Sequence, residues 1–329
     1  MTVTIYDVAR EAKVSMATVS RVLNGNPNVK PETRKKVKDV IDRLNYRPNA
    51  VARGLASKKT TTVGVIIPDI SDLYYSALAR GLEDVAEMYN YQIIITNTDQ
   101  DSQKEENAFL NLVSKQVDGI IFLGGKLSGK VREDIERANI PVVICGSGQD
   151  AIEVPSVNIN YYEAAKEIAS KFIADDTKHL GFVTGGYSRY QENLMLEGMK
   201  AAFSDAGLNG DDYIMIEEAR DYDSGRDIFP KLIDNNRDAV IVVSDEAAIG
   251  ILHGGHDHGV AMPQRLQIVS CSNTRLVTMV RPKISSISVP LYDIGAVGMR
   301  LLTKLMNEEK VDSSVVELPY SVEYRTTTR

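Results

Sequence analysis

The 329-residue sequence predicts an α/β protein in which a small helical domain precedes two doubly wound parallel-sheet units in series. The first 60 residues contain short helical patterns, and the rest alternates apolar strand-like runs with helical stretches in two successive sets. The charge changes sign at the same place: residues 1–60 carry 13 basic and five acidic side chains, a balance of +8, whereas the remainder is −15. Such asymmetry is typical of a protein whose small module meets a polyanion.

The basic segment predicts three helices. Residues 5–12 form the first, with Thr4 and Asp7 as its N-cap pair. Ser15 can cap the second, and Pro31 fits the first turn of the third. Two helices separated by a short break, the second exposing small polar side chains and Arg21, make the helix-turn-helix pattern of major-groove binding proteins. A three-helix unit without a DNA-binding role is the alternative. The charge balance favours DNA, because phosphate neutralisation supplies most non-specific affinity.

A short helix is also predicted over residues 49–57. A helix of this length is unstable alone, and Gly54 weakens it further. We therefore expect it to order only against a partner surface. Residues 58–62 form a polar linker before the first strand of the body.

The body predicts strands over 63–68, 92–97, 118–123, 141–145 and 156–159, and then over 179–183, 213–216, 239–243 and 266–270. These runs are almost continuously apolar, as buried parallel sheets require. Ligands of such folds bind at the carboxyl ends of strands. The positions expected at a cleft are therefore Asp69, Gly146, Ser244 and Ser272.

Several classes of protein are disfavoured. There is no dinucleotide-binding glycine fingerprint, no P-loop and no catalytic constellation, so we expect neither an enzyme nor a cofactor. His253, His256 and His258 lie at an expected helix end, where Gly254, Gly255 and Gly259 mark a loop. No fourth ligand is identifiable, which favours a solvated helix terminus over a metal site. Cys145 and Cys271 are expected to be buried free thiols. Without a signal-peptide core or an apolar run of about 18 residues, a cytoplasmic protein is expected.

Residues 4–12, 14–24 and 46–55 resemble the lactose-repressor (LacI/GalR) family of bacterial regulators. Within that family, residues 15–21, 52–71 and 292–297 resemble the members that govern carbon catabolism in Gram-positive bacteria. The resemblance implies a homodimeric, nucleoid-associated transcriptional repressor and activator that binds pseudo-palindromic catabolite-responsive operators.

The resemblance also implies how the chain is divided. A helix-turn-helix domain would span 1–48, and a hinge helix with its linker would span 49–60. A periplasmic-binding-protein-like core would follow, with an N-terminal subdomain of 61–160 plus 289–318 and a C-terminal subdomain of 161–288 plus 319–329.

For DNA recognition, the resemblance implies three groups of residues. Base edges would be contacted by Met16, Ala17, Thr18 and Arg21. The DNA backbone would be contacted by Tyr6, Ser15, Ser20, Asn24, Asn28, Lys30 and Tyr46. The hinge would enter the minor groove through Asn49, Ala52 and Leu55. Arg21 is the best candidate for a bidentate contact to guanine, and Leu55 corresponds to a wedge that unstacks the central base step.

The effector cleft departs from that of sugar-sensing relatives. Those relatives hold a small ligand with an arginine and an aspartate, and the corresponding positions here are Met195 and Ser272. Loss of both charges should weaken recognition of a polar effector. The cleft is therefore interpreted as a degenerate effector site with, at most, weak sugar-phosphate effectors, formed by Asp69, Met195, Ser244, Asp245, Ser272 and Asn273.

A different surface is expected to receive the signal. Asp293, Val297, Arg300 and Lys304 are spaced to share one helix face, and the cationic pair suits a phosphoryl group. The resemblance implies that this group belongs to serine-phosphorylated phosphocarrier protein HPr, or a paralogue, acting as corepressor. The docking residues would be Tyr89, Tyr292, Asp293, Val297, Arg300 and Lys304.

Three alternatives remain. A sugar- or nucleobase-responsive repressor of the same family is the nearest, and the residues at 195 and 272 oppose it. A solute-binding receptor is opposed by the basic head and the missing signal peptide. An enzyme is opposed by the lack of a catalytic constellation.

Overall fold

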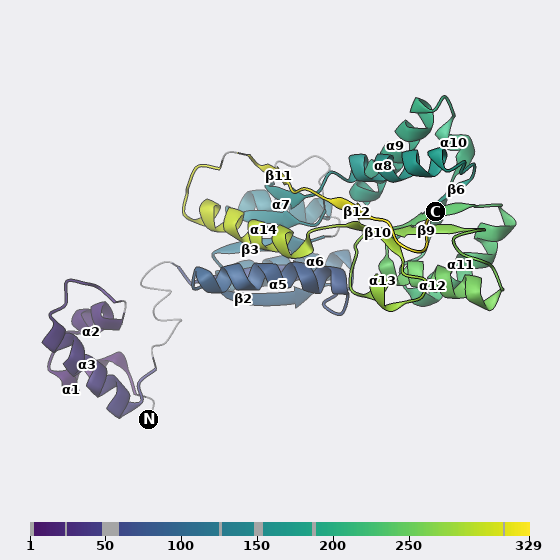
Figure 1. Ribbon diagram of the computed structural model, residues 1–329. Helices are drawn as coiled ribbons and strands as arrows, with labels where there is room; N and C mark the ends of the chain where they lie inside the picture. Colours follow the sequence, from purple (N-terminus) through teal and green to yellow (C-terminus); the bar gives the residue numbers. More distant parts are fainter. Residues whose placement is uncertain are drawn as a thin grey trace. The chain divides into compact units, whose positions relative to one another are not determined.

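The computed structural model describes residues 3–23, 25–47, 59–124, 127–147, 154–185, 189–311 and 313–329. The chain forms two compact units, Met1–Thr60 and Thr61–Arg329 (Figure 1). The predicted α/β fold class, with a helical domain before two parallel-dominated sheets, is confirmed. Within the described ranges, no helix is long and apolar enough to cross a membrane.

The N-terminal unit contains three helices, α1 (Ile5–Ala12), α2 (Met16–Leu23) and α3 (Pro31–Leu44). The Asp7 carboxylate accepts hydrogen bonds from the Thr4 backbone N–H at 3.0 Å and from the Thr4 hydroxyl at 2.8 Å, so the predicted cap begins α1. Valine and alanine side chains on the inner faces of the helices form one small core, which includes Val8, Ala12, Val19, Val22, Val37 and Val40.

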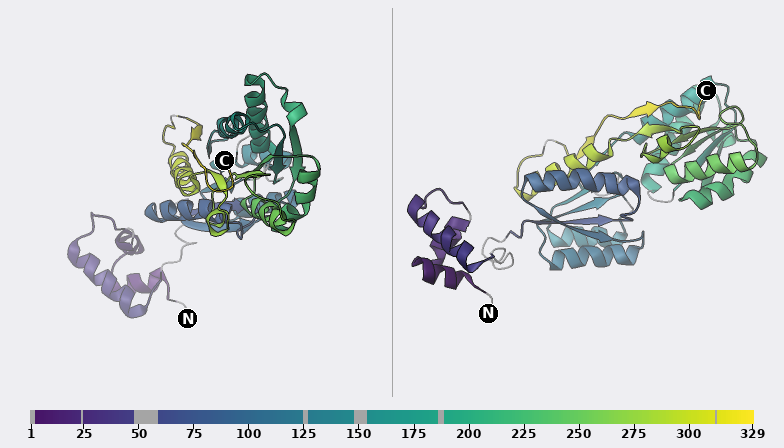
Figure 2. Two further views of the ribbon diagram at one scale, coloured as in Figure 1. Left: turned by 45° about the vertical axis from the view of Figure 1, so that its right-hand side comes forward. Right: turned by 60° about the horizontal axis from the view of Figure 1, so that its bottom comes forward.

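The first sheet of the body has the strand order β11-β5-β4-β3-β1-β2, and all of its pairings are parallel. Its strands are β1 (Thr62–Ile67), β2 (Gln92–Asn97), β3 (Gly119–Leu123), β4 (Val142–Cys145), β5 (Ser156–Asn158) and β11 (Val315–Glu317). Helices α5 (Leu73–Met88) and α14 (Leu291–Met306) cover one face, and α6 (Ser102–Ser114) and α7 (Gly129–Ala138) cover the other (Figure 2). Both faces are buried, which explains why these strands are apolar throughout.

The second sheet has the order β12-β10-β9-β8-β6-β7, with only β10 and β12 antiparallel among its described pairings. Its strands are β6 (Leu180–Thr184), β7 (Ile214–Glu218), β8 (Ala239–Val242), β9 (Gln267–Ser270), β10 (Ser285–Ser288) and β12 (Ser321–Glu323). Helices α8 (Tyr161–Ala174) and α9 (Arg189–Asp205) cover one face, and α11 (Tyr222–Asp234) and α12 (Asp245–Asp257) cover the other. The short helices are α10 (Gly210–Tyr213) and α13 (Leu276–Met279).

The chain passes between the two sheets three times: from β5 to α8, from β10 to α14, and from β11 to β12. One continuous apolar cluster contains side chains of both sheets, for example Val65 of β1 and Phe182 of β6. The second passage places α14, from near the end of the sequence, along α5, from near the start of the body (Figure 1).

Glycines allow α5 and α14 to touch through their backbones. A Cβ atom added at Gly81 would lie 1.9 Å from the Tyr292 carbonyl oxygen, and one added at Gly295 would lie 2.0 Å from that of Leu78. Neither position can hold a larger residue without moving a helix. The crossing therefore fixes α14 relative to α5.

One local prediction needs correction. Gly254 and Gly255 were expected to mark a loop after the helix, but α12 continues through both to Asp257. A Cβ at Gly254 would lie 2.7 Å from the Phe229 Cβ, so these glycines allow α12 to pack closely on α11. Packing between helices overrides the usual preference of glycine for turns here.

Candidate nucleic-acid interface and regulatory surfaces

Helix α2 presents a polar face opposite its buried one. Val19 and Val22 are buried in the core of the N-terminal unit, whereas Met16 is 41% exposed and Arg21 is exposed. The Thr18 backbone N–H donates to the Ser15 hydroxyl oxygen at 3.2 Å, so Ser15 caps the helix as predicted. The predicted base-contacting residues Met16, Ala17, Thr18 and Arg21 are all exposed or half-buried.

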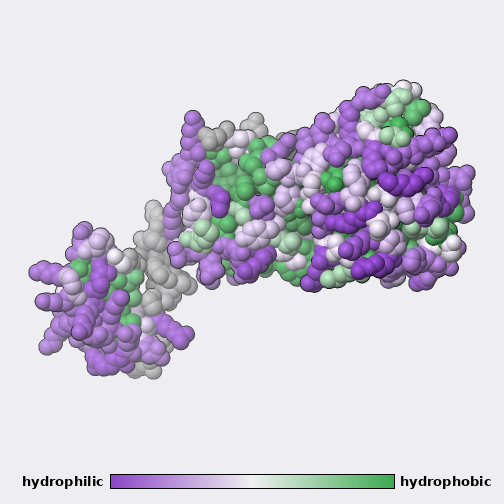
Figure 3. Space-filling model, viewed as in Figure 1, coloured by the Kyte–Doolittle hydropathy of each residue, from purple (hydrophilic) through white to green (hydrophobic). Residues whose placement is uncertain are grey.

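The predicted backbone contacts also reach the surface of this unit. Tyr6, Ser15, Asn28 and Lys30 are exposed, and Ser20 and Tyr46 are half-buried. The face of the N-terminal unit seen in Figure 3 is mostly hydrophilic. Four predicted DNA contacts, Asn24, Asn49, Ala52 and Leu55, lie outside the described residues.

Helix α14 has one buried and one exposed face. Ile294, Met299 and Leu302 pack into the core. The predicted docking residues are on the other face: Tyr292, Asp293, Arg300 and Lys304 are exposed, and Val297 is half-buried. Neither Arg300 nor Lys304 forms an ion pair with another described residue.

Helix α5 extends this exposed face. The Tyr292 hydroxyl donates a hydrogen bond to the Asp84 carboxylate at 2.9 Å, which raises the pKa of the tyrosine. Asp84 also pairs with Arg80 at 2.8 Å. Tyr89, at the C-terminal cap of α5, is exposed as well. The sequence analysis missed Arg80 and Asp84, because only the tertiary crossing shows that α5 borders α14.

A cavity of about 310 Å³ lies in the body, at the carboxyl ends of strands from both sheets. Of the positions expected there, Asp69, Gly146, Ser244, Asp245 and Ser272 line it. Met195 does not, because it is fully buried in the core; Gln191, one helical turn earlier on α9, lines the cavity instead. Asn273 also lies apart, and its side chain donates to Ser288 and accepts from Arg325.

The cavity is acidic. Asp72, the N-cap of α5, accepts a hydrogen bond from the Tyr74 backbone N–H at 2.8 Å. Burial raises the pKa of Asp72 to about 6, with further contributions from Glu246, Asp245 and Asp69. Burial also raises the pKa of Asp245, whose Oδ2 accepts from the Thr274 backbone N–H at 2.7 Å. Asp72 and Glu246 were not singled out from the sequence, although Asp72 follows β1 closely and Glu246 follows β8 closely.

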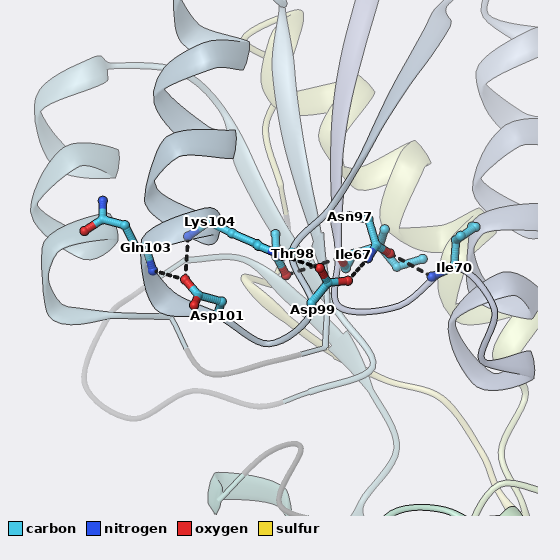
Figure 4. A network of polar contacts seen from close by, with 8 residues as sticks. All are labelled: Ile67, Ile70, Asn97, Thr98, Asp99, Asp101, Gln103 and Lys104. Carbon is cyan, nitrogen blue, oxygen red and sulfur yellow. Dashed lines mark hydrogen bonds and ion pairs between the residues drawn. The ribbon is translucent and has the colours of Figure 1, made fainter.

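Polar contacts at the end of β2 hold the turns that follow β1 and β2 (Figure 4). Asn97 accepts a hydrogen bond from the Ile70 backbone N–H at 2.9 Å and donates to Asp99, which also pairs with Lys104. Asp101 caps α6 through the backbone N–H groups of Gln103 and Lys104. These bonds fix the loop that carries Gln100, which lines the cavity.

Among the residues that the structure describes, no group of three His, Cys, Asp or Glu side chains could hold a metal ion. His253 is hydrogen-bonded to the Tyr222 hydroxyl at 2.9 Å, and His258 to the Gly254 carbonyl at 2.8 Å. Cys145 and Cys271 are buried free thiols, as predicted.

A helix-turn-helix unit joined to two parallel sheets around a cleft defines a DNA-binding transcription regulator with a periplasmic-binding-protein-like core. Residues 4–49 match the family model described as bacterial regulatory proteins, lacI family, and residues 169–328 match the periplasmic binding protein-like domain. The chain belongs to the lacI family.

Its relatives include catabolite control protein A of Staphylococcus aureus (strain N315), 56% identical over 329 residues and covering 100% of both chains. The same protein of Staphylococcus epidermidis is 57% identical over the same length. The resemblance to the family members that govern carbon catabolism is thereby confirmed. These relatives are transcription regulators rather than enzymes.

Solved structures of two other regulators have the same fold as this chain. The transcription regulator CcpA of Lactococcus lactis has a TM-score of 0.77 and 34% identity, and the match covers 82% of this chain and 99% of that one. The Lac repressor dimer bound to operator and the anti-inducer ONPF has a TM-score of 0.86 at 22% identity, with 100% and 99% coverage, and shares the fold.

Proposed function

We propose that this protein regulates carbon catabolite repression and activation in the cytoplasm. It binds pseudo-palindromic operators as a homodimer, and serine-phosphorylated HPr or a paralogue is its corepressor. The observation that carries the proposal is the exposed cationic pair Arg300 and Lys304 on α14, one helical turn apart in a body whose net charge is −15. Full-length similarity to catabolite control protein A supports the same function.

In this proposal α2 enters the major groove of the operator. Met16, Ala17, Thr18 and Arg21 contact base edges, while the exposed polar residues around α2 hold the DNA backbone. The hinge residues Asn49, Ala52 and Leu55 order in the minor groove. Unstacking the central step costs a few kcal/mol, which contacts with the bent DNA offset.

Docking of the corepressor depends on attraction between its negative phosphoserine and the two cations of α14. A phosphoserine carries a charge of about −1.5 to −2 and three acceptor oxygens, which the guanidinium of Arg300 and the ammonium of Lys304 can bind together. Tyr292, held by Asp84, and the half-buried Val297 provide contact area beside the phosphate. Asp293 and Tyr89 border the same surface.

Exposed apolar side chains on one edge strand of each sheet support the homodimer. Ile95 of β2 is 47% exposed and Ile216 of β7 is 50% exposed, and each strand is the last of its sheet. Ile70 and Met279 are further exposed apolar residues of the body. Exposed apolar surface on a regulator of this kind is typical of a subunit interface.

A repressor controlled by a small effector is the second candidate, because the cavity is large enough for a sugar. Buried Met195 and the uncharged Ser272 leave this cavity without the usual charged ligands. Its acidic lining also opposes a sugar phosphate, whose effect should accordingly be weak.

The test is a titration of labelled palindromic operator DNA, followed by fluorescence anisotropy, with and without phosphorylated HPr. Phosphorylated HPr should increase the operator affinity of the wild type, and Arg300→Ala should abolish this gain while leaving the affinity without HPr unchanged. Arg137→Ala is the matched control, because Arg137 is an exposed arginine on α7. If Arg300→Ala retains the gain, the docking surface lies elsewhere; if the wild type shows no gain, HPr is not the corepressor.

A further inference from the structure

The cavity of the body is bounded by carboxylates from both sheets. Asp69 and Asp72 follow β1 of the first sheet, and Asp245 and Glu246 begin α12, which follows β8 of the second. Asp221, the N-cap of α11, is a further acid in the lining. The basic residue of the lining, Arg220, pairs with Glu218 at 2.8 Å. Among the described residues of the lining, five acids thus face one base that is already engaged.

Asp72 is held in its wall by the start of a helix. It caps α5 through the Tyr74 backbone N–H, so its carboxylate cannot turn away without uncapping the helix. The charges that act on it are Glu246 and Asp245 from α12 and Asp69 from its own loop. An ionised Asp72 is therefore repelled by acids across the cavity, at a site where burial reduces solvent screening.

One wall belongs to the first sheet and the other to the second, and the three passages of the chain connect these sheets. Near the passage from β5 to α8, the Tyr74 hydroxyl donates to the Gly146 carbonyl at 2.7 Å and lies 3.3 Å from the Tyr161 hydroxyl. Tyr161 begins α8 of the second sheet, whereas Tyr74 lies two residues after Asp72. Electrostatic repulsion of Asp72 therefore acts close to the passage from β5 to α8, where the chain connects the two sheets.

We propose that this cleft responds to protons in place of a small-molecule effector: protonation of Asp72 keeps its two walls in the close arrangement of this structure, and ionisation separates them. This inference goes beyond the proposed function, since it requires neither DNA nor HPr. It gives the cavity a role although the charged ligands of sugar-sensing relatives are missing.

The direction of the pH dependence follows from the raised pKa. Below about pH 6 the Asp72 carboxyl is mainly protonated, so the close arrangement is favoured. When the walls separate, the repulsion by Glu246 and Asp245 is relieved and Asp72 returns toward its ordinary pKa of 3.8. The two arrangements therefore differ in bound protons only between about pH 4 and pH 6, so separation of the walls should increase over this range and level off above it.

Energy transfer between two dyes can measure this separation. Glu133→Cys on α7 and Asp234→Cys on α11 place one exposed label on each side, and the natural cysteines are buried. An excess of unlabelled protein ensures that each labelled chain reports only on itself. We expect transfer efficiency to change between about pH 4 and pH 7, with its midpoint between about 4 and 6.

Three variants test the cause in the full-length protein. Asp72→Asn keeps the helix cap, because asparagine caps as well as aspartate, and it should remove the transition. Glu246→Gln removes a repelling charge from the opposite wall and should lower the midpoint by part of a pH unit. Asp227→Asn, an exposed acid on α11 outside the cavity, should leave the midpoint unchanged.

The proposal is overturned if the wild type shows no transition between pH 4 and pH 7. It is equally overturned if Asp72→Asn keeps the wild-type midpoint, as would occur if one of the four histidines were responsible. Should Asp72→Asn fail to fold, the Glu246→Gln midpoint decides: a lowered value supports the proposal and an unchanged value refutes it.

Discussion

Arg21 has two properties that a base-contacting residue needs. Its side chain is exposed, and the buried Val19 and Val22 of the same helix anchor that helix in the core of the N-terminal unit. An arginine in a major groove can bind guanine through two hydrogen bonds, which discriminate against another base by roughly 1–3 kcal/mol. Arg21→Ala should remove this discrimination. The measurement is competition between the operator and a DNA in which single G·C pairs are replaced.

Arg43→Ala is the matched control for this experiment, because Arg43 is an exposed arginine of the same unit that pairs with Glu11 on α1. It should retain the wild-type preference for the operator. If Arg21→Ala weakens all DNAs by the same factor and keeps the preference, Arg21 contacts phosphate and not a base.

Local residue features were predictable because their causes are local. The Thr4 and Ser15 caps depend on neighbours within three residues, and both are present. The acidic cavity was predictable only in part, since Asp72 and Glu246 come together through strands that are distant in sequence. Met195, assigned to the cleft by resemblance, is displaced from the lining by a single helical turn.

At the scale of elements, the crossing of α5 and α14 carries both stability and the proposed docking surface. Gly81→Ala would place a Cβ 1.9 Å from the Tyr292 carbonyl oxygen, so the helices must separate. Overpacking of this kind typically costs about 1–3 kcal/mol. We expect urea unfolding to show that loss in the free energy of unfolding, together with a weaker gain in operator affinity from phosphorylated HPr.

Gly129→Ala is the control at this scale. Gly129 begins α7, and a Cβ added there would meet no atom within 4 Å. Its free energy of unfolding should match or slightly exceed that of the wild type, because alanine is favoured in helices. A Gly81→Ala protein as stable as Gly129→Ala would show that the crossing adapts without cost.

The spacing of Asp293, Val297, Arg300 and Lys304 predicted a common helix face, since helical periodicity needs no tertiary information. The contact of Tyr292 with Asp84 could not be predicted, because no local pattern indicates which helix lies alongside another. The two glycines of α12 were misassigned for a related reason: only the packed neighbour Phe229 explains them.

For the whole molecule, alternating strands and helices predicted two parallel sheets, and the structure contains both, with an antiparallel pairing of β12 on β10 in the second. The order of strands within each sheet could not be derived, since an apolar run does not specify its neighbours. The three passages of the chain between the sheets could not be derived from the sequence either. They nevertheless matter most for function, because they bring the acidic walls together and place α14 on α5.

The opposite charges of the two units imply a last prediction. Lys30 is exposed at the start of α3 in the +8 segment, and a phosphate contact there releases counterions. Lys30→Ala should weaken operator and non-operator DNA by a similar factor and reduce the slope of log affinity against log salt by about 1 per protomer. Lys310→Ala, an exposed lysine of the acidic body, should leave the slope unchanged. A loss confined to the operator would instead make Lys30 a base contact.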